Sequence, residues 1–359
     1  MSRFLQLHLL TFFPPANLNR DDLGRPKTAI VGGMTRLRLS SQALKRAWRT
    51  SELFTTALDG HMGLRTQRLG EQVLDRLVAG GMPADKAVVT AREIAGGFGK
   101  PKDPKDKNPT QIEQLAFIAP EERDAAFALA DRAIGGEKID EKAVKEARES
   151  GLLRRVDTAA DIALFGRMLA SSPEYNREAA AQVAHAITTH AVTVEDDYYT
   201  AVDDLKTSAN DAGAGFLGEA AFGSGVFYLY LCVDTALLLR NLGGDAETAR
   251  IALAALIEAA ATTAPRGKQN SFAAHGRAGY VLAERGDRQP RTLAGAFAQA
   301  VAQGEAGGDP MAASVARLRK FREQLDAAYG LEPEVSMQMC VAESGPATLP
   351  QIIAFGATA

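Results

Sequence analysis

The spacing of the apolar residues changes along this chain, and the change limits the folds that the chain can adopt. Leu5, Leu7 and Leu9 alternate with polar residues, which predicts a first strand near the N-terminus. From about 64 to 169, apolar residues recur at helical spacing instead. After 183 the strand-like pattern returns. The sequence therefore predicts an α+β protein with a helical middle.

The first strand also predicts how the sheet is covered. Gln6 and His8 share the face opposite the three leucines, which is typical of a sheet covered on one side only. His8 is expected to be a partly exposed structural residue or, alternatively, a ligand contact. Further strands are expected at 185–194, 225–233, 278–283 and 336–341, and helices at 138–150, 235–242, 245–262, 293–303, 309–328 and 348–355. This order of elements, with an open sheet face, suits an RRM-like (ferredoxin-like) domain.

Positive charge is concentrated in residues 19–49. This stretch holds eight Lys or Arg against two Asp, a net charge of +6, whereas the rest of the chain carries a net charge of −9. A local basic surface on an acidic chain is typical of a protein that binds a phosphate backbone.

Within this stretch we expect a capped basic helix. Ser40 or Ser41 supplies an N-cap hydroxyl, and a helix follows from Gln42 to about Leu53. Lys45 and Arg49 are four residues apart with Arg46 beside them, so three cations share a solvent-facing arc along which RNA could lie. An ordinary amphipathic helix with a solvated basic side explains the composition equally well.

The segment before this helix is expected to be a strand with one charged face. Arg36 and Arg38 alternate with Leu37 and Leu39. In an extended strand both guanidiniums then face one side and both leucines face the core.

Several classes of protein are disfavoured. Two cysteines, Cys232 and Cys340, are too few for a disulfide framework or a thiolate zinc site, so we expect a cytoplasmic protein without a metal. The Gly99-Lys100 pair lacks the remainder of a P-loop, and no cofactor is expected. The N-terminal apolar run is interrupted by polar residues and is not expected to enter a membrane.

Several short motifs resemble one family in order along the chain. They are LNRDD at 18–22, the glycine pair at 32–33, RxRxSSQxLKRA at 36–47, DIALFGRM at 161–168, AHAITTH at 184–190, TAVDDL at 200–205, SGVFY at 224–228 and NLGG at 241–244. Together they are similar to the CasC family, the backbone subunit of the type I-E CRISPR Cascade complex. The resemblance implies an RRM-like palm at 1–60 and 183–359, a helical finger insertion at 61–182 and a β-hairpin thumb at 195–223.

The resemblance also implies the residues that contact nucleic acid. The expected RNA-binding residues are Arg20, Lys27, Arg38, Ser40, Gln42, Lys45, Arg46, Arg49, Met168 and Lys268. The thumb residues are Tyr199, Thr200 and Val202, and the finger residues expected to contact DNA are Lys138, Lys142, Lys145 and Arg148. The family's second lysine beside Lys142 is replaced here by Glu141, which weakens one contact. A salt-bridged surface helix is the alternative reading of the finger stripe.

The function implied by the resemblance is non-catalytic. We expect a subunit that polymerises head to tail along a guide RNA (crRNA) without reading its sequence, with target DNA and the other Cascade subunits as further partners. The aromatic RNA-binding signature of RRM domains is absent, so binding should depend on phosphates. The alternative is an RNA-processing nuclease that uses His8, His185, His190 or His275 as acid or base.

Overall fold

The computed structural model describes residues 2–201, 216–331 and 335–358. By its internal contacts the chain forms two compact units. Unit 1 comprises the described residues of 1–54, 183–232 and 253–358, and unit 2 comprises those of 55–182 and 233–252. The division into palm, finger and thumb remains a prediction about functional parts.

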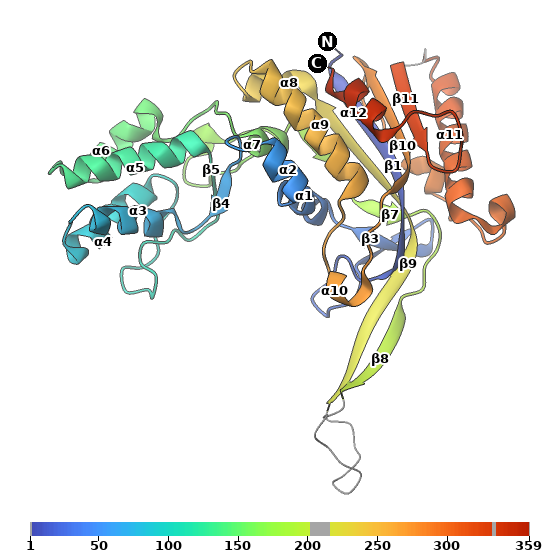
Figure 1. The fold of residues 1–359 in the computed structure, drawn as a ribbon, viewed down its shortest axis with the longest axis horizontal. Coiled ribbons are helices and arrows are strands. Elements are labelled where there is room, and N and C mark those ends of the chain that lie inside the picture. The colour runs from blue at the N-terminus through green and yellow to red at the C-terminus, as the bar shows by residue number, and fades with distance from the viewer. Residues whose placement is uncertain (1, 202–215, 332–334, 359) are drawn as a thin grey trace, which may run out of the picture. The chain divides into compact units, whose positions relative to one another are not determined.

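Unit 1 is built on an antiparallel sheet (Figure 1). Its strands run in the order β11-β10-β1-β9-β7-β3-β2, and β6 and β8 also pair with β9. Their bounds are β1 Phe4–Ala16, β2 Thr28–Val31, β3 Met34–Leu39, β6 Ala181–Val183, β7 Ala186–Thr188, β8 Glu195–Ala201, β9 Phe216–Asp234, β10 Ala278–Gly286 and β11 Val335–Cys340. The strands expected near 4–13, 225–233, 278–283 and 336–341 are therefore present, whereas the strand expected at 185–194 covers only three residues.

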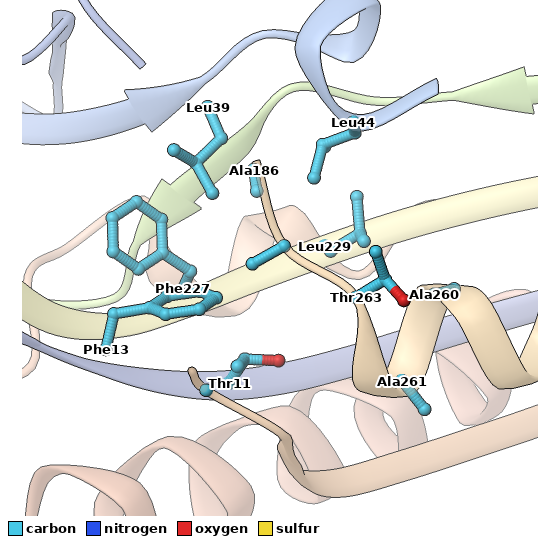
Figure 2. A pocket seen from close by; sticks show the side chains of 12 residues that line it. Thr11, Phe13, Leu39, Leu44, Ala186, Phe227, Leu229, Ala260, Ala261 and Thr263 are labelled. Atoms are coloured by element: carbon cyan, nitrogen blue, oxygen red, sulfur yellow. The ribbon is translucent and has the colours of Figure 1, made fainter. Parts of the chain in front are cut away.

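One face of this sheet packs against helices α1 (Ser41–Arg49), α9 (Ala246–Thr262) and α12 (Leu349–Ala357). Figure 2 shows the small gap that remains among Phe13, Phe227, Leu39, Leu44 and Ala260. Its volume is about 20 Å³, which is room for about one water molecule. The gap is an imperfection of core packing and is too small for a ligand.

The opposite face is covered as well, which corrects the expectation of a sheet covered on one side. Gln6 and His8 are both buried. Helix α11 (Pro310–Ala328) and a short 3-10 turn, η3 (Ala294–Phe297), lie over this face, and Leu10, Tyr228 and Phe297 join the core there. Alternation along one strand cannot reveal a cover supplied by segments that lie almost 300 residues away.

The helix expected at 293–303 is limited to the turn η3 by hydrogen bonds to other segments. The carbonyl of Phe297 accepts from the guanidinium of Arg36, and the backbone N–H of Val301 donates to the carbonyl of Thr189. A longer α-helix would join these same two groups, Phe297 O and Val301 N, to each other. Hydrogen bonds to Arg36 and Thr189 therefore take the place of this helical hydrogen bond.

Unit 2 is mainly helical, as expected. Its helices are α3 (Leu69–Ala79), α4 (Ala84–Gly96), α5 (Pro120–Ile134), α6 (Glu141–Ala147), α7 (Ala160–Phe165) and α8 (Thr235–Asn241), with short strands β4 (Leu64–Thr66) and β5 (Ala116–Ile118). Buried apolar residues of α3, α4 and α5, including Val73, Ala91 and Leu129, form its core. The remaining short elements are α2 (Glu52–Ala57), η1 (Arg148–Leu152), η2 (Pro173–Tyr175), α10 (Gln269–Phe272) and η4 (Glu305–Gly308).

Among the residues that the structure describes, no helix is both long enough and apolar enough to cross a bilayer.

Candidate nucleic-acid interface

Helix α1 begins as the sequence predicts. The side-chain oxygen of Ser40 accepts from the backbone N–H of Ala43, and the Ser40 N–H donates to the side chain of Asn19. Ser40 is also buried, so little of its surface is exposed for the predicted RNA contact. The helix ends at Arg49, earlier than expected, because the Ser51 hydroxyl bonds to the carbonyl of Trp48 and caps the next helix at the N–H of Phe54.

The three cations of α1 are not equally exposed. Arg46 is exposed, whereas Lys45 and Arg49 are half-buried. Burial lowers the pKa of Lys45 below its usual value. Gln42 is exposed one turn earlier. The predicted arc is therefore centred on Arg46.

Arg46 lines an open groove of about 660 Å³ in unit 1. Arg20 enters it from the loop after β1, and Arg266 enters it from the loop after α9. We call the hollow lined by Asn19, Arg20, Arg46, Thr50 and Arg266 the basic groove. Three guanidiniums from segments far apart in the sequence thus share one hollow.

The local chain geometry explains how these segments come together. A Cβ atom on Gly267 would lie 2.3 Å from the carbonyl oxygen of Leu18 and 2.5 Å from that of Asn17, so only glycine permits this close approach. The carboxylate of Asp21, which also lines the groove, accepts from the backbone N–H groups of Leu23 and Arg25. Its charge is therefore partly compensated inside the loop.

The sequence predicted Lys268 as an RNA-binding residue, whereas Arg266, two residues earlier, was not predicted. Both are exposed, and Lys268 has a left-handed backbone, with φ of 51°, at the start of α10. The signal that could have found Arg266 is the Pro-Arg-Gly order, because the glycine marks a close backbone contact beside the arginine.

A second basic cluster contains Lys27 and Arg38 but not Arg36. The backbone N–H of Arg38 donates to the carbonyl of Lys27, and its guanidinium lies 2.9 Å from Nδ1 of His185. Arg36 is fully buried and donates to the carbonyls of Thr188 and Phe297, which corrects the expected pair of exposed guanidiniums.

The predicted thumb is a hairpin in the residues that the structure describes. Strand β8 is exposed throughout and pairs with β9 from Glu195↔Phe222 to Ala201↔Phe216. Tyr199 lies opposite Gly218 and covers it, and Thr200 is exposed beside Tyr199. Val202 lies outside the described residues.

The finger cations are mostly paired with carboxylates. Lys138 lies 3.4 Å from Asp140 and Lys142 lies 3.7 Å from Glu146, whereas Lys145 is exposed. Such exposed pairs are weak and exchange readily with other anions.

Arg148 departs further from the predicted stripe. It is half-buried, bonds to Ser172 and Glu174, and lies in the π-helical turn η1. The stripe expected on one helix over 138–150 is therefore shorter, because α6 spans only 141–147.

Met168 is an exposed residue of unit 2 that follows a buried one. It is 77% exposed and lines an open pocket of about 250 Å³ together with Leu115 and Lys100. The preceding Arg167 is buried and donates to Glu122 at 2.6 Å and to three backbone carbonyls. An exposed apolar side chain on so well anchored a backbone is suited to contact a base.

The comparisons with known proteins identify the family. A family model described as "CT1975-like protein" matches residues 5–354, nearly the whole chain. The chain belongs to the CT1975-like protein family. No curated protein sequence matches it.

Solved structures show the same relationship. A chain from a structure titled "CRISPR RNA-guided surveillance complex, pre-nicking" is 32% identical, with a TM-score of 0.84 over 99% of each chain. A chain from a "CRISPR RNA-guided surveillance complex" is 27% identical, with a TM-score of 0.75 over 99% of this chain and 100% of the other. This CT1975-like protein therefore has the fold of surveillance-complex subunits, as the motifs predicted, and the finer CasC assignment stays a prediction.

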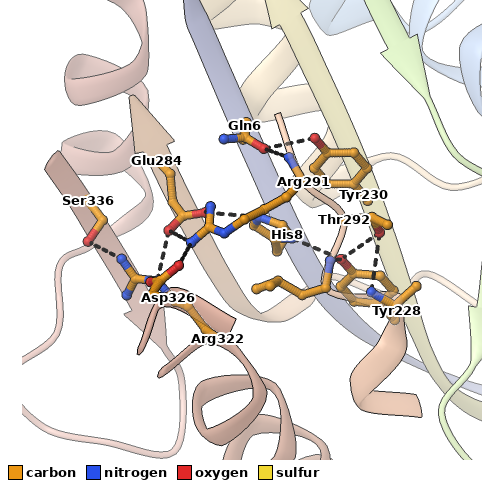
Figure 3. Close-up of polar contacts among 12 residues, drawn as sticks. Gln6, His8, Tyr228, Tyr230, Glu284, Arg291, Thr292, Arg322, Asp326 and Ser336 are labelled. Atoms are coloured by element: carbon orange, nitrogen blue, oxygen red, sulfur yellow. Dashed lines mark hydrogen bonds and ion pairs between the residues drawn. The ribbon is translucent and has the colours of Figure 1, made fainter. Parts of the chain in front are cut away.

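The histidines of this CT1975-like protein do not form a common site. Figure 3 shows His8 enclosed in a polar network, with Nδ1 2.9 Å from the hydroxyl of Tyr228 and Nε2 3.2 Å from Glu284. Arg291 and Arg322 also contact Glu284. His8 is fully buried, so it is neither the partly exposed residue nor the ligand contact that the sequence suggested.

The other histidines contact separate parts of the chain. His190 bonds to the carbonyl of Ala191, and His61 in unit 2 bonds to the carbonyl of Thr158. His275 is exposed. Among the described residues, no three His, Cys, Asp or Glu side chains are grouped to hold a metal ion.

Proposed function

We propose that this CT1975-like protein is a non-catalytic subunit that binds the guide RNA of a CRISPR surveillance complex without regard to its sequence. The basic groove carries this proposal, because Arg20, Arg46 and Arg266 converge there in unit 1. As part of the same proposal, the subunit is of the CasC kind in a cytoplasmic type I-E Cascade complex.

The chemistry of the groove favours contact with the RNA backbone. A guanidinium presents several N–H donors in one plane, which matches the oxygens of a phosphate. Of the described residues that line the groove, none is aromatic, so bases have no ring on which to stack. Contacts limited to phosphates carry no sequence information.

We infer that unit 1 acts as an RRM-like palm and that the β8–β9 hairpin acts as its thumb. The hairpin is exposed and carries Tyr199 and Thr200 away from the sheet, where a neighbouring copy could be contacted. Head-to-tail contacts that do not close into a ring produce a filament, here along the guide. Other Cascade subunits are further partners in this proposal.

We infer further that unit 2 acts as the finger and supports target DNA. Bases left free by phosphate-only binding can pair with DNA, so the reading of sequence passes to base pairing. Lys138, Lys142 and Lys145 would contact DNA strands without specificity, and Met168 would contact a displaced base. The exposure of Lys145 and Met168 supports these roles.

The non-catalytic assignment is part of the proposal. The burial of His8 and the separate surroundings of His61 and His190 favour it over an RNA-processing nuclease. The nuclease alternative requires that the purified protein cleave RNA and that a histidine-to-alanine variant lose this cleavage.

Charge reversal in the basic groove tests the function. Binding of fluorescein-labelled single-stranded RNA is measured by anisotropy for the wild type, Arg46→Glu and Arg266→Glu. The matched control is Lys320→Glu, which reverses an exposed cation on α11 outside the groove. We expect each groove variant to weaken binding about tenfold or more, since a charged hydrogen bond is worth about 1.5–3 kcal/mol, and the control to bind like the wild type.

Two results would overturn the proposal. The first is equal loss of binding in Lys320→Glu and Arg46→Glu, which would indicate a diffuse charge effect. The second is a large difference in affinity between RNAs of equal length and unrelated sequence, which would contradict a phosphate-only interface.

A further inference from the structure

Three basic side chains lie in a row across neighbouring segments of the sheet in unit 1. On one side of Arg38 in β3 lies Lys27, whose backbone carbonyl accepts a hydrogen bond from the Arg38 N–H. On its other side Arg38 pairs with Ile187 of β7. His185 lies two residues before Ile187 and therefore on the same face as Arg38. We call these side chains the Lys27–Arg38–His185 row.

The contact inside the row fixes the state of the histidine. The guanidinium of Arg38 lies 2.9 Å from Nδ1 of His185. Because an arginine can only donate, Nδ1 must accept, and the imidazole is then neutral with its proton on Nε2. Partial burial, with the positive charges of Arg38 and Lys27, lowers the pKa of His185. The row thus holds two cations and a neutral imidazole.

We propose that this row is a phosphodiester-binding site in which RNA binding is coupled to protonation of His185. The inference rests on the RNA-binding function proposed above. It adds His185 to the residues that contact RNA and couples binding to the uptake of a proton. His185 takes a proton from solvent at Nδ1, its bond with Arg38 breaks, and both groups then donate N–H bonds to the phosphate oxygens. No covalent bond changes.

The surroundings of His185 favour this exchange. The charged groups that act on it are Arg38 from β3 and Lys27 from the loop before β2. On the other side, β9 contributes Tyr230, whose pKa is raised by burial, so its phenol stays neutral. A phosphate anion would offset the repulsion among Arg38, Lys27 and a protonated His185.

Thermodynamic linkage gives the sign of the effect. The pKa of His185 is low in the free protein and rises when the phosphate binds, so binding takes up a proton at pH values between the two pKa values. Affinity for RNA therefore increases as the pH falls through this interval. The limiting slope is about tenfold in Kd per pH unit.

The test measures binding of a fluorescein-labelled single-stranded RNA at constant ionic strength at pH 8, 7 and 6. We expect wild-type binding to tighten by about three- to tenfold over this range. His185→Asn keeps an acceptor near the position of Nδ1 but cannot be protonated, so its affinity should not vary with pH. His275→Asn, which removes an exposed histidine elsewhere in unit 1, should retain the pH dependence.

The outcomes separate this inference from the proposed function. Wild-type binding that does not vary with pH, or a pH dependence retained in His185→Asn, overturns the coupling and leaves RNA binding intact. Failure to bind RNA at every pH overturns both proposals. Selective ¹⁵N labelling of histidine gives a second readout, because the pKa of His185 should rise when RNA is added, and an unchanged pKa would contradict the inference.

Discussion

The guanidinium of Arg167 lies 2.6 Å from the carboxylate of Glu122, and both side chains are fully buried. The next residue, Met168, is exposed. A buried ion pair fixes the backbone from which an apolar side chain reaches into solvent.

Breaking this pair should destabilise unit 2. Glu122→Gln leaves the charge of Arg167 buried without its counter-charge, and such a change costs about 3–5 kcal/mol. The matched control is Asp131→Asn, which breaks the exposed pair with Arg76 and should cost under about 1 kcal/mol. Urea unfolding checks both values, and equal costs would show that the buried pair has no special role.

RNA affinity should depend strongly on salt. For single strands the logarithm of the binding constant falls with the logarithm of salt concentration by about 0.7 per phosphate contacted. Removing one contact by Arg46→Gln should therefore reduce the slope by about 0.7. Titrations between low and moderate salt measure it, and a slope near zero would rule out a phosphate-based interface.

The close approach at Gly267 should be essential to the basic groove. Gly267→Ala places a Cβ against the carbonyls of Leu18 and Asn17, so the loop that carries Arg266 must move. We expect lower RNA affinity and a loss of about 1–3 kcal/mol in stability. Gly96→Ala is the control, because its added Cβ finds only ordinary contacts at 3.6 Å and beyond, and it should be neutral or slightly stabilising.

Acid should destabilise unit 1 through the network around His8. Burial lowers the pKa of His8, so below about pH 6.5 the unfolded state binds the extra proton and stability falls. Burial of Glu284 opposes ionisation, but its bond with His8 and the guanidiniums of Arg322 and Arg291 lower its pKa to about 2. Its contribution is complete above about pH 4.5 and is lost toward pH 2.

Replacing the histidine isolates the first of these effects. His8→Phe removes the titrating group while keeping a ring near Tyr230, whose centroid lies 5.0 Å from that of His8. Its stability should change less than that of the wild type between pH 7 and 5. Urea unfolding at each pH measures this, and parallel curves for the two proteins would contradict the assignment.

The hairpin should be needed for assembly and not for RNA binding by one copy. Ala201 and Phe216 are paired in register, so a two-residue Asn-Gly turn in place of 202–215 closes the shortened hairpin. We expect this variant to bind a short RNA like the wild type but to form no regular particles on a long one. Electron microscopy would count the particles. Normal filaments formed by the variant would show that the hairpin is not needed for assembly.

Local features of this fold could be predicted from the sequence. The cap at Ser40, the helices α9 and α11, and the strand β9 follow from patterns within a few residues of each other, because capping and hydrophobic period are local.

Features that depend on contacts between distant segments could not be predicted from the sequence. The burial of Arg36 requires the carbonyls of Thr188 and Phe297, and the place of Arg266 in the groove requires contact between Gly267 and Leu18. Neither partner can be identified from spacing along one chain. The RNA contacts proposed for Arg266 and His185 were therefore not predicted from the sequence, although those of the nearby Lys268 and Arg38 were.

Arg36 also limits the routes that are open to a polynucleotide in the proposed function. By tying the backbone at Phe297 to the sheet, it keeps the 293–301 segment over the middle strands, where RNA lies in modules that read bases on aromatic platforms. In the function proposed above, this segment would exclude a guide strand from the centre of that face of the sheet. Lys27 and Arg38 lie instead at the β2 and β3 margin, where the strand of the proposed function would keep its bases free for a complementary strand.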